Sequence, residues 1–150
     1  MIFHRILPIL LVFNSFFSTS QTLTNSNLPI VIITTQNGVP IPDDPRVVAH
    51  MGVIDNGAGF TNNVNDPFTT YDGRIEIEIR GSTSQQYPKK SYGLETQDVL
   101  GNNLNVSFLG MPVENDWILN GPYPDKTMIR NVLTFDIAQK MGHYSSNTRY

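Results

Sequence analysis

"YDGRIEIEIRG", residues 71–81, decides the fold of this 150-residue chain. Ile75, Ile77 and Ile79 alternate with charged residues, and successive side chains of a β-strand point to opposite faces of a sheet. The stretch therefore predicts a strand with one face on a hydrophobic core and the other face in water. Gly81 then introduces a turn.

The segments around this strand predict further strands. "NLPIVIITT" (residues 27–35) is rich in β-branched residues and predicts a strand buried on both faces, and "RVVAHMGVI" (46–54) predicts a second strand. Residues 55–72 are rich in Gly, Asn, Asp and Thr, which favour turns, so a long surface loop is expected there. Three more strands are expected at residues 89–96, 103–108 and 116–121, the first of them as an antiparallel neighbour of 71–81.

A change of period marks the one predicted helix. In "DKTMIRNVLTFDIAQKMG" (125–142) the apolar residues recur at helical spacing, which predicts an amphipathic helix over residues 127–141. Asp125 or Thr127 is the expected N-cap, and Gly142 is placed to end the helix. The elements together predict an α+β fold, an antiparallel β-rich half with one packed helix.

The first twenty residues have the features of a secretory signal peptide. His4 and Arg5 precede an apolar run over residues 6–17, and small residues follow up to Ser20, the expected cleavage position. The run is short for a membrane span, which makes an uncleaved anchor the weaker alternative. We therefore predict a secreted or cell-envelope protein with one domain over residues 21–150 and no membrane span after cleavage.

Composition excludes several classes of protein. The net charge is −3 and Lys89-Lys90 is the one basic doublet, so no tract suits nucleic acid and no nucleic-acid partner is expected. The chain has no cysteine, which excludes a disulfide scaffold, a thiolate nucleophile and a cysteine zinc site. No calcium-loop spacing and no Gly-x-Ser-x-Gly motif occurs, so no metal ligand is predicted and the catalytic residues stay unknown.

"RGSTSQQYPKKSYGLE", residues 80–95, is the stretch with the clearest chemical potential. Consecutive backbone N–H groups and hydroxyls after Arg80, followed by Lys89 and Lys90, are groups that suit a phosphate. A strand rather than a helix is expected after the lysines, so this is no P-loop, and the residues alone favour a solvated hairpin turn. Arg130 and Asn131 open the predicted helix, where either anion binding or surface capping is possible.

Three blocks in order carry a family resemblance: "IEIRGSTSQQYPKKSYGLE", "LGMPVENDWILNGPYPDKTMIRN" and "MGHYSSNTRY". Their order and spacing resemble the CotH family, the spore-coat-type atypical protein kinases. The resemblance is densest from Gly73 to Tyr150. It implies a diverged kinase-like fold in which this chain forms the N-terminal, N-lobe-like half of the kinase domain.

The resemblance implies an exported enzyme that transfers phosphate from ATP, with Mg²⁺, to serines of secreted or surface proteins. In a kinase a lysine-bearing strand grips the nucleotide phosphates and a helix packs behind it. The implied phosphate contacts are Arg80, Ser82, Ser84, Lys89, Lys90 and Arg130. Lys90 is favoured over Lys89, although the phase of the strand leaves either residue possible.

Two departures from a complete kinase limit this interpretation. The helix contains Asp136 but no Glu to pair with the lysine. The resemblance also places the family's catalytic base and metal-binding carboxylates beyond Tyr150, so the chain is expected to be incomplete and inactive by itself. The alternative is a non-catalytic β-rich module that binds partners or mediates adhesion at the cell surface.

Overall fold

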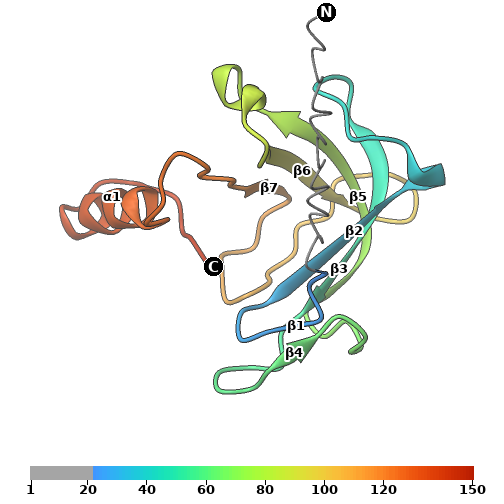
Figure 1. The fold of residues 1–150 in the computed structure, drawn as a ribbon, viewed down its shortest axis with the longest axis horizontal. Coiled ribbons are helices and arrows are strands. Elements are labelled where there is room, and N and C mark those ends of the chain that lie inside the picture. The colour runs from blue at the N-terminus through green and yellow to red at the C-terminus, as the bar shows by residue number, and fades with distance from the viewer. Residues whose placement is uncertain (1–21) are drawn as a thin grey trace, which may run out of the picture.

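The computed structural model describes residues 22–150, so the predicted signal peptide lies outside the described residues. A twisted five-stranded antiparallel sheet, in the order β2-β3-β5-β6-β7, forms the body of the described residues, and their one α-helix lies to one side of it (Figure 1). A second sheet consists of only two short strands, β1 and β4. The predicted α+β class, with a β-rich antiparallel half, is confirmed.

The structure contains seven strands, two 3₁₀ turns and one α-helix within residues 22–150. They are β1 Asn25–Ser26, β2 Ile30–Thr35, the 3₁₀ turn η1 Gln36–Gly38, β3 Val47–Ile54, β4 Asn62–Asn63, β5 Tyr71–Arg80, the 3₁₀ turn η2 Thr83–Gln86, β6 Ser91–Gln97, β7 Asp116–Leu119 and α1 Arg130–Lys140. β5, the longest strand, pairs with β3 on one side and with β6 on the other. None of the helices formed by residues 22–150 is long and apolar enough to cross a membrane.

The alternation within β5 builds the core as predicted. Ile75 and Ile77 are fully buried, while Arg74 and Glu76 on the opposite face stay partly exposed. Neighbouring strands and the segment that follows β6 complete the core with Ala49, Met51, Val53, Leu94 and Phe108. Trp117 packs against this cluster, with its ring centroid 4.2 Å from that of Phe108.

Two strand predictions need correction. The strand predicted at 27–35 is shorter in the structure, where it is β2. It is an edge strand with a single buried residue, Ile30, so the prediction of burial on both faces was wrong. Residues 103–108 form no strand and make only two isolated bridges, Gln97 to Asn103 and Val106 to Glu114. This segment crosses the inner face of the sheet and packs Val106 and Phe108 against the core, so its apolar residues reflect burial rather than strand pairing.

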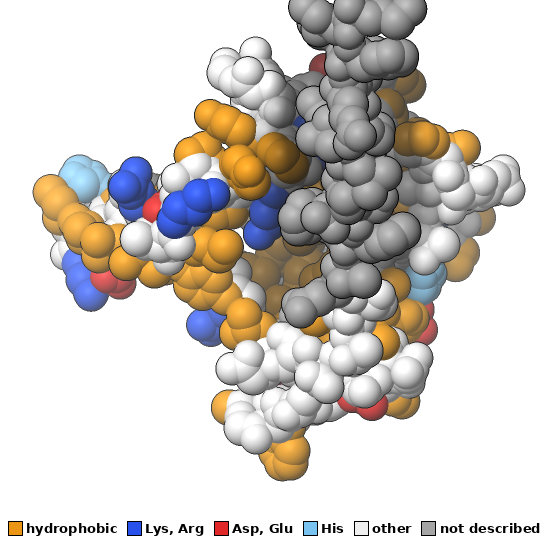
Figure 2. Space-filling view, in the orientation of Figure 1, with side chains coloured by type: hydrophobic (Ala, Val, Ile, Leu, Met, Phe, Trp, Pro, Cys, Tyr) orange, Lys and Arg blue, Asp and Glu red, His pale blue; other side chains and the backbone are white. Residues whose placement is uncertain are grey.

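The helix also differs from its prediction. α1 begins at Arg130 rather than at residue 127, because Met128 has a positive φ of 59°, which an α-helix does not accommodate. It ends near Gly142, which has the expected positive φ. No residue of α1 is buried, so the prediction of a helix packed behind the lysine-bearing strand was wrong. Hydrophobic side chains gather where the helix projects from the sheet (Figure 2).

The outer face of the sheet carries a row of carboxylates. Glu95 on β6 lies opposite Glu76 on β5 and opposite Asp116 on β7. Arg46 offsets part of this charge, with Nε 3.2 Å from a carboxylate oxygen of Glu78 and a second contact to Glu95. Partial burial, followed by the neighbouring Glu95 carboxylate, raises the pKa of Asp116. The folded structure therefore disfavours the charged form of Asp116.

Candidate functional site

A cleft of about 580 Å³ lies at one end of the sheet. The antiparallel register places the end of β5, the start of β6 and the end of β7 together, since Arg80 pairs with Ser91 and Tyr92 pairs with Leu119. The loop of residues 81–90 and the loop of residues 120–129 both leave the sheet at this end and form the walls of the cleft. Lys and Arg side chains gather between α1 and the sheet (Figure 2).

The first wall is a compact turn rather than an open hairpin. Gly81 has φ 104°, and a Cβ there would lie 2.1 Å from Ser84 Oγ, so the turn requires glycine. The side chain of Gln85 donates to the Gly81 carbonyl and to Asp43, and Lys90 Nζ donates to the Gln85 carbonyl. The Lys90 ammonium is thus used to hold the turn.

The second wall touches the first at Gly121. A Cβ on Gly121 would lie 2.2 Å from the Lys90 carbonyl oxygen, so the two loops approach more closely than any other residue allows. The Gly121 N–H also donates to Ser91 Oγ at 3.0 Å. The rings of Tyr87 and Tyr123 stack across the same junction, with centroids 5.4 Å apart. These contacts fix the spacing of the walls.

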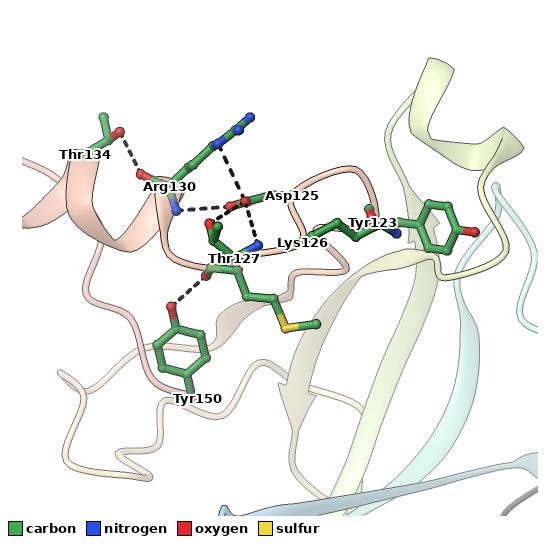
Figure 3. Close-up of polar contacts among 8 residues, drawn as sticks. Tyr123, Asp125, Lys126, Thr127, Arg130, Thr134 and Tyr150 are labelled. Carbon is green, nitrogen blue, oxygen red and sulfur yellow. Dashed lines mark hydrogen bonds and ion pairs between the residues drawn. The ribbon is translucent and has the colours of Figure 1, made fainter.

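Asp125 organises the entry to α1 (Figure 3). Its carboxylate accepts hydrogen bonds from the Thr127 N–H and hydroxyl and from the Arg130 N–H, at 2.6–3.1 Å. Arg130 Nε lies 3.6 Å from the same carboxylate. The Thr127 hydroxyl, the Arg130 N–H and the Arg130 charge all favour the ionised form and hold the pKa of Asp125 below its usual range. Asp125 is therefore an anion at the N-terminal end of the helix.

The structure brings three of the six predicted contacts into the cleft. Arg80, Ser84 and Arg130 line it, together with the side chains of Ser91, Asn120 and Asn131. Ser82, Lys89 and Lys90 lie on the surrounding turn and do not line the cleft. Both lysines precede β6 instead of lying on it, so the question of strand phase does not arise.

Sequence reasoning did not identify Tyr87, Ser91 or Asn120 as part of the site. Each occurs in one of the quoted blocks, Tyr87 and Ser91 in "YPKKSY" and Asn120 in "LNGPYP". Residue type alone gave no reason to select them, because serine and asparagine are ordinary turn residues and Tyr87 directly precedes a proline. Only the pairing of β5, β6 and β7 shows that the two blocks face each other.

The cleft offers little to a resident metal ion. Within residues 22–150 no group of three or more His, Asp or Glu side chains could hold one. Asp125 is the carboxylate in the cleft, and its oxygens are already engaged by Thr127 and Arg130. The two guanidinium groups, two hydroxyls and two amides form a donor set that suits an anion instead.

Comparison with known proteins gives one match. Residues 77–150 match the family model described as CotH kinase protein. This segment runs from the middle of β5 to Tyr150 and contains both walls of the cleft and α1. No curated protein and no solved structure matches the chain.

Proposed function

Because residues 77–150 match the family model described as CotH kinase protein, we propose that this chain forms the nucleotide-binding portion of an exported ATP-dependent protein kinase. The cleft at the end of the sheet binds the ATP phosphates. The substrates are serine hydroxyls of secreted or surface proteins.

The meeting of Arg80 and Arg130 in one cleft carries this proposal. Arg80 ends β5 and Arg130 opens α1, so two separate elements each contribute an arginine to the lining of one cleft. Guanidinium is the side-chain group best suited to bidentate binding of phosphate. The cleft volume of about 580 Å³ lies within the roughly 300–1,000 Å³ typical of small-molecule sites.

Asp125 competes with a phosphate for Arg130. The ion pair is long, at 3.6 Å, and the Arg130 side chain is 78% exposed, so solvent screens it strongly. A doubly charged phosphate outcompetes a single carboxylate at that distance, and the exposed arginine is free to turn towards it. Asp125 keeps its remaining hydrogen bonds to Thr127 and to the helix N–H group.

The surrounding turn supports the site in this proposal. Lys90 fixes the turn through the Gln85 carbonyl, and its ammonium group adds positive charge to that turn. Lys89 and Ser82 lie on the same turn and contribute to the field at the cleft without lining it. Direct contact with phosphate is thus assigned to Arg80, Ser84 and Arg130.

Binding and transfer are separable in this chain. Phosphoryl transfer requires a divalent metal and a base near the attacking hydroxyl. The residues of the cleft do not fit a resident Mg²⁺, because its one carboxylate is engaged, and we derive no step through the metal. We therefore propose that residues 22–150 bind ATP and transfer no phosphate by themselves.

Calorimetry with ATP tests the proposal. Arg130→Ala and Arg80→Ala each remove a charge-assisted contact of about 1.5–3 kcal/mol, equivalent to a roughly ten- to hundredfold loss of affinity. Lys140→Ala is the matched control, because Lys140 is an exposed cation on the same helix that pairs with Asp136 outside the cleft. Folded protein that binds no ATP, or variants that bind it as the parent does, would favour the surface-module alternative.

Export is tested independently of the nucleotide. In a host with a secretory pathway, mass spectrometry of the exported product should find an N-terminus within a few residues of Gln21. Soluble cytoplasmic protein that retains Met1 would refute export while leaving ATP binding unaffected.

A further inference from the structure

Among residues 22–150, no strand pairs with one backbone edge of β2. β2 pairs with β3 through six consecutive residues, from Ile30 opposite Ile54 to Thr35 opposite Ala49. It is the first strand in the sheet order, and within residues 22–150 no backbone hydrogen bond reaches its other side. An unpaired strand edge is a template for another strand.

This edge lacks most of the features that usually prevent pairing, although Pro29 stands directly before it. Residues 22–42 contain no charged side chain, and β2 itself contains no proline or glycine. Its register with β3 is continuous, without a bulge. Val31, Ile32 and Ile33 are only partly buried, so a strand added here would cover apolar side chains on both faces.

The opposite edge of the sheet is protected. β7 has only four residues and begins at the charged Asp116. The Asn-Gly-Pro sequence of residues 120–122 ends it immediately, and proline cannot donate to a ladder. A short, charged edge is a usual defence against strand addition, and because Pro29 also flanks β2, the two edges differ in length and charge rather than in a flanking proline. Of the two edge strands, β2 is therefore the one that is open to the addition of another strand.

We propose that β2 pairs with β2 of a second copy of this chain, antiparallel, so that the two sheets become one continuous sheet. A two-fold axis perpendicular to the sheet relates the two copies. This rotation makes the two β2 strands antiparallel and keeps the core faces of both sheets on the same side. One residue then faces its own counterpart across the axis. The centre of β2 places Ile32 or Ile33 there.

A second copy fits this edge because the edge is uncharged. Like charges directly opposite each other destabilise a ladder, and identical strands can avoid them only if they carry none. The carboxylate row begins on β5. In the joined sheet, β5 of one copy and β5 of the other are separated by five strand spacings of about 4.8 Å, which is about 24 Å. That separation exceeds the Debye length of about 8 Å at physiological salt, so the acidic rows repel each other weakly.

The expected dimer is weak and reversible. Six residues per strand form a narrow contact, well below the area of a standard stable interface. Backbone hydrogen bonds supply the affinity and the apolar side chains of β2 add to it. Association should therefore depend on protein concentration.

Sedimentation over a concentration series provides the first test. The parent protein should show a monomer–dimer equilibrium, and Ile32→Lys should weaken it at least tenfold by placing two charges near the axis. Ile118→Lys makes the same change on the protected edge, where Ile118 is 53% exposed, and should leave association unchanged. Thr34→Lys changes an exposed residue of β2, so it gives the same result even if Ile32→Lys fails to fold.

Disulfide trapping provides the second test, and the chain contains no native cysteine to interfere. Directly opposed residues of antiparallel strands have Cα atoms about 4.5–5.5 Å apart, within the range of a disulfide. Either Ile32→Cys or Ile33→Cys should form a covalent dimer readily, and Ile118→Cys should not.

Three results would overturn the proposal. One is a monomer at every concentration up to about 1 mM. Another is association that Leu133→Glu on α1 abolishes and Ile32→Lys does not, which would place the contact on the helix. The third is a monomer whose β2 instead takes up an extended peptide of another protein, detected by protection of the β2 amides from exchange.

Discussion

Gly121→Ala tests how the walls of the cleft are held. A Cβ at this position would lie 2.2 Å from the Lys90 carbonyl oxygen and 2.8 Å from its carbon. Both are backbone atoms just ahead of β6, so neither can rotate away as the end of a side chain could. The two loops must separate by about 1 Å to restore ordinary contact, which stretches the bond from the Gly121 N–H to Ser91 Oγ.

The expected loss of stability combines two terms. Insertion of a methyl group into a filled space costs about 1–3 kcal/mol, and loss of the hydrogen bond to Ser91 adds about 0.5–1.5 kcal/mol. Calorimetry with ATP should also show weaker binding, because Arg80 and Arg130 belong to opposite walls and move apart. Denaturant unfolding and ATP titration on the same variant measure the two effects separately.

Gly93→Ala is the matched control. Gly93 lies on β6 without a positive φ, and a Cβ there would meet its nearest neighbour at 3.7 Å, an ordinary contact. This variant should keep both stability and affinity. If Gly121→Ala behaves like Gly93→Ala in both measurements, the contact between the walls does not hold the cleft, and the assignment of Arg80 and Arg130 to one site loses its geometric basis.

Three further predictions concern the scaffold. Asp116→Asn should raise the melting temperature at neutral pH. The pKa of Asp116 is higher in the folded protein than in the unfolded chain, so its protonated form favours folding at a pH below its ordinary pKa. That contribution is lost as the pH rises through the raised pKa, and asparagine does not ionise. The gain lies at the lower end of about 0.2–1 kcal/mol, since Asp116 is exposed, and disappears near about pH 3. Ile77→Ala should cost about 2–5 kcal/mol in denaturant unfolding, against less than about 0.5 kcal/mol for the exposed Ile118→Ala. The double variant Leu133→Ser, Ile137→Ser should reduce binding of a hydrophobic dye without changing the melting of the sheet, because neither residue is buried.

The central strand could be predicted from the sequence because its signal is local. The alternation in β5 reports which face is buried, and both the strand and its buried isoleucines follow from residues 71–81 alone. The antiparallel neighbour at residues 89–96 also follows from sequence, since the chain has only a short turn in which to return. These predictions need no knowledge of the rest of the chain.

Edge and packing positions could not be predicted in the same way. "NLPIVIITT" has the composition of a central strand, but which strand ends a sheet depends on the pairing of all the others. The helix has an apolar stripe, yet no described element covers it, because amphipathic spacing shows which side would pack and not whether a partner is present. Its first residue is set by Met128, whose positive φ depends on the turn around Asp125.

Part of the candidate site could be predicted from the sequence. Arg80 and Arg130 are fifty positions apart, and the family resemblance rather than any local pattern joined them. Their meeting has a simple structural cause: β6 pairs with both β5 and β7, so the loops that follow β5 and β7 start from the same end of the sheet. The direction of Lys90 could not be inferred, because it depends on the Gln85 carbonyl presented by η2.

The cleft therefore depends on the register of three strands. A shift of one residue between β5 and β6 would turn Ile75 and Ile77 to the solvent and would also move Arg80 away from Ser91. The buried isoleucines thus protect the position of the phosphate-binding groups, since any slip that opens the cleft also exposes the core. Substitutions in the core should consequently reduce ATP binding only through unfolding, whereas Gly121→Ala should reduce it in molecules that remain folded.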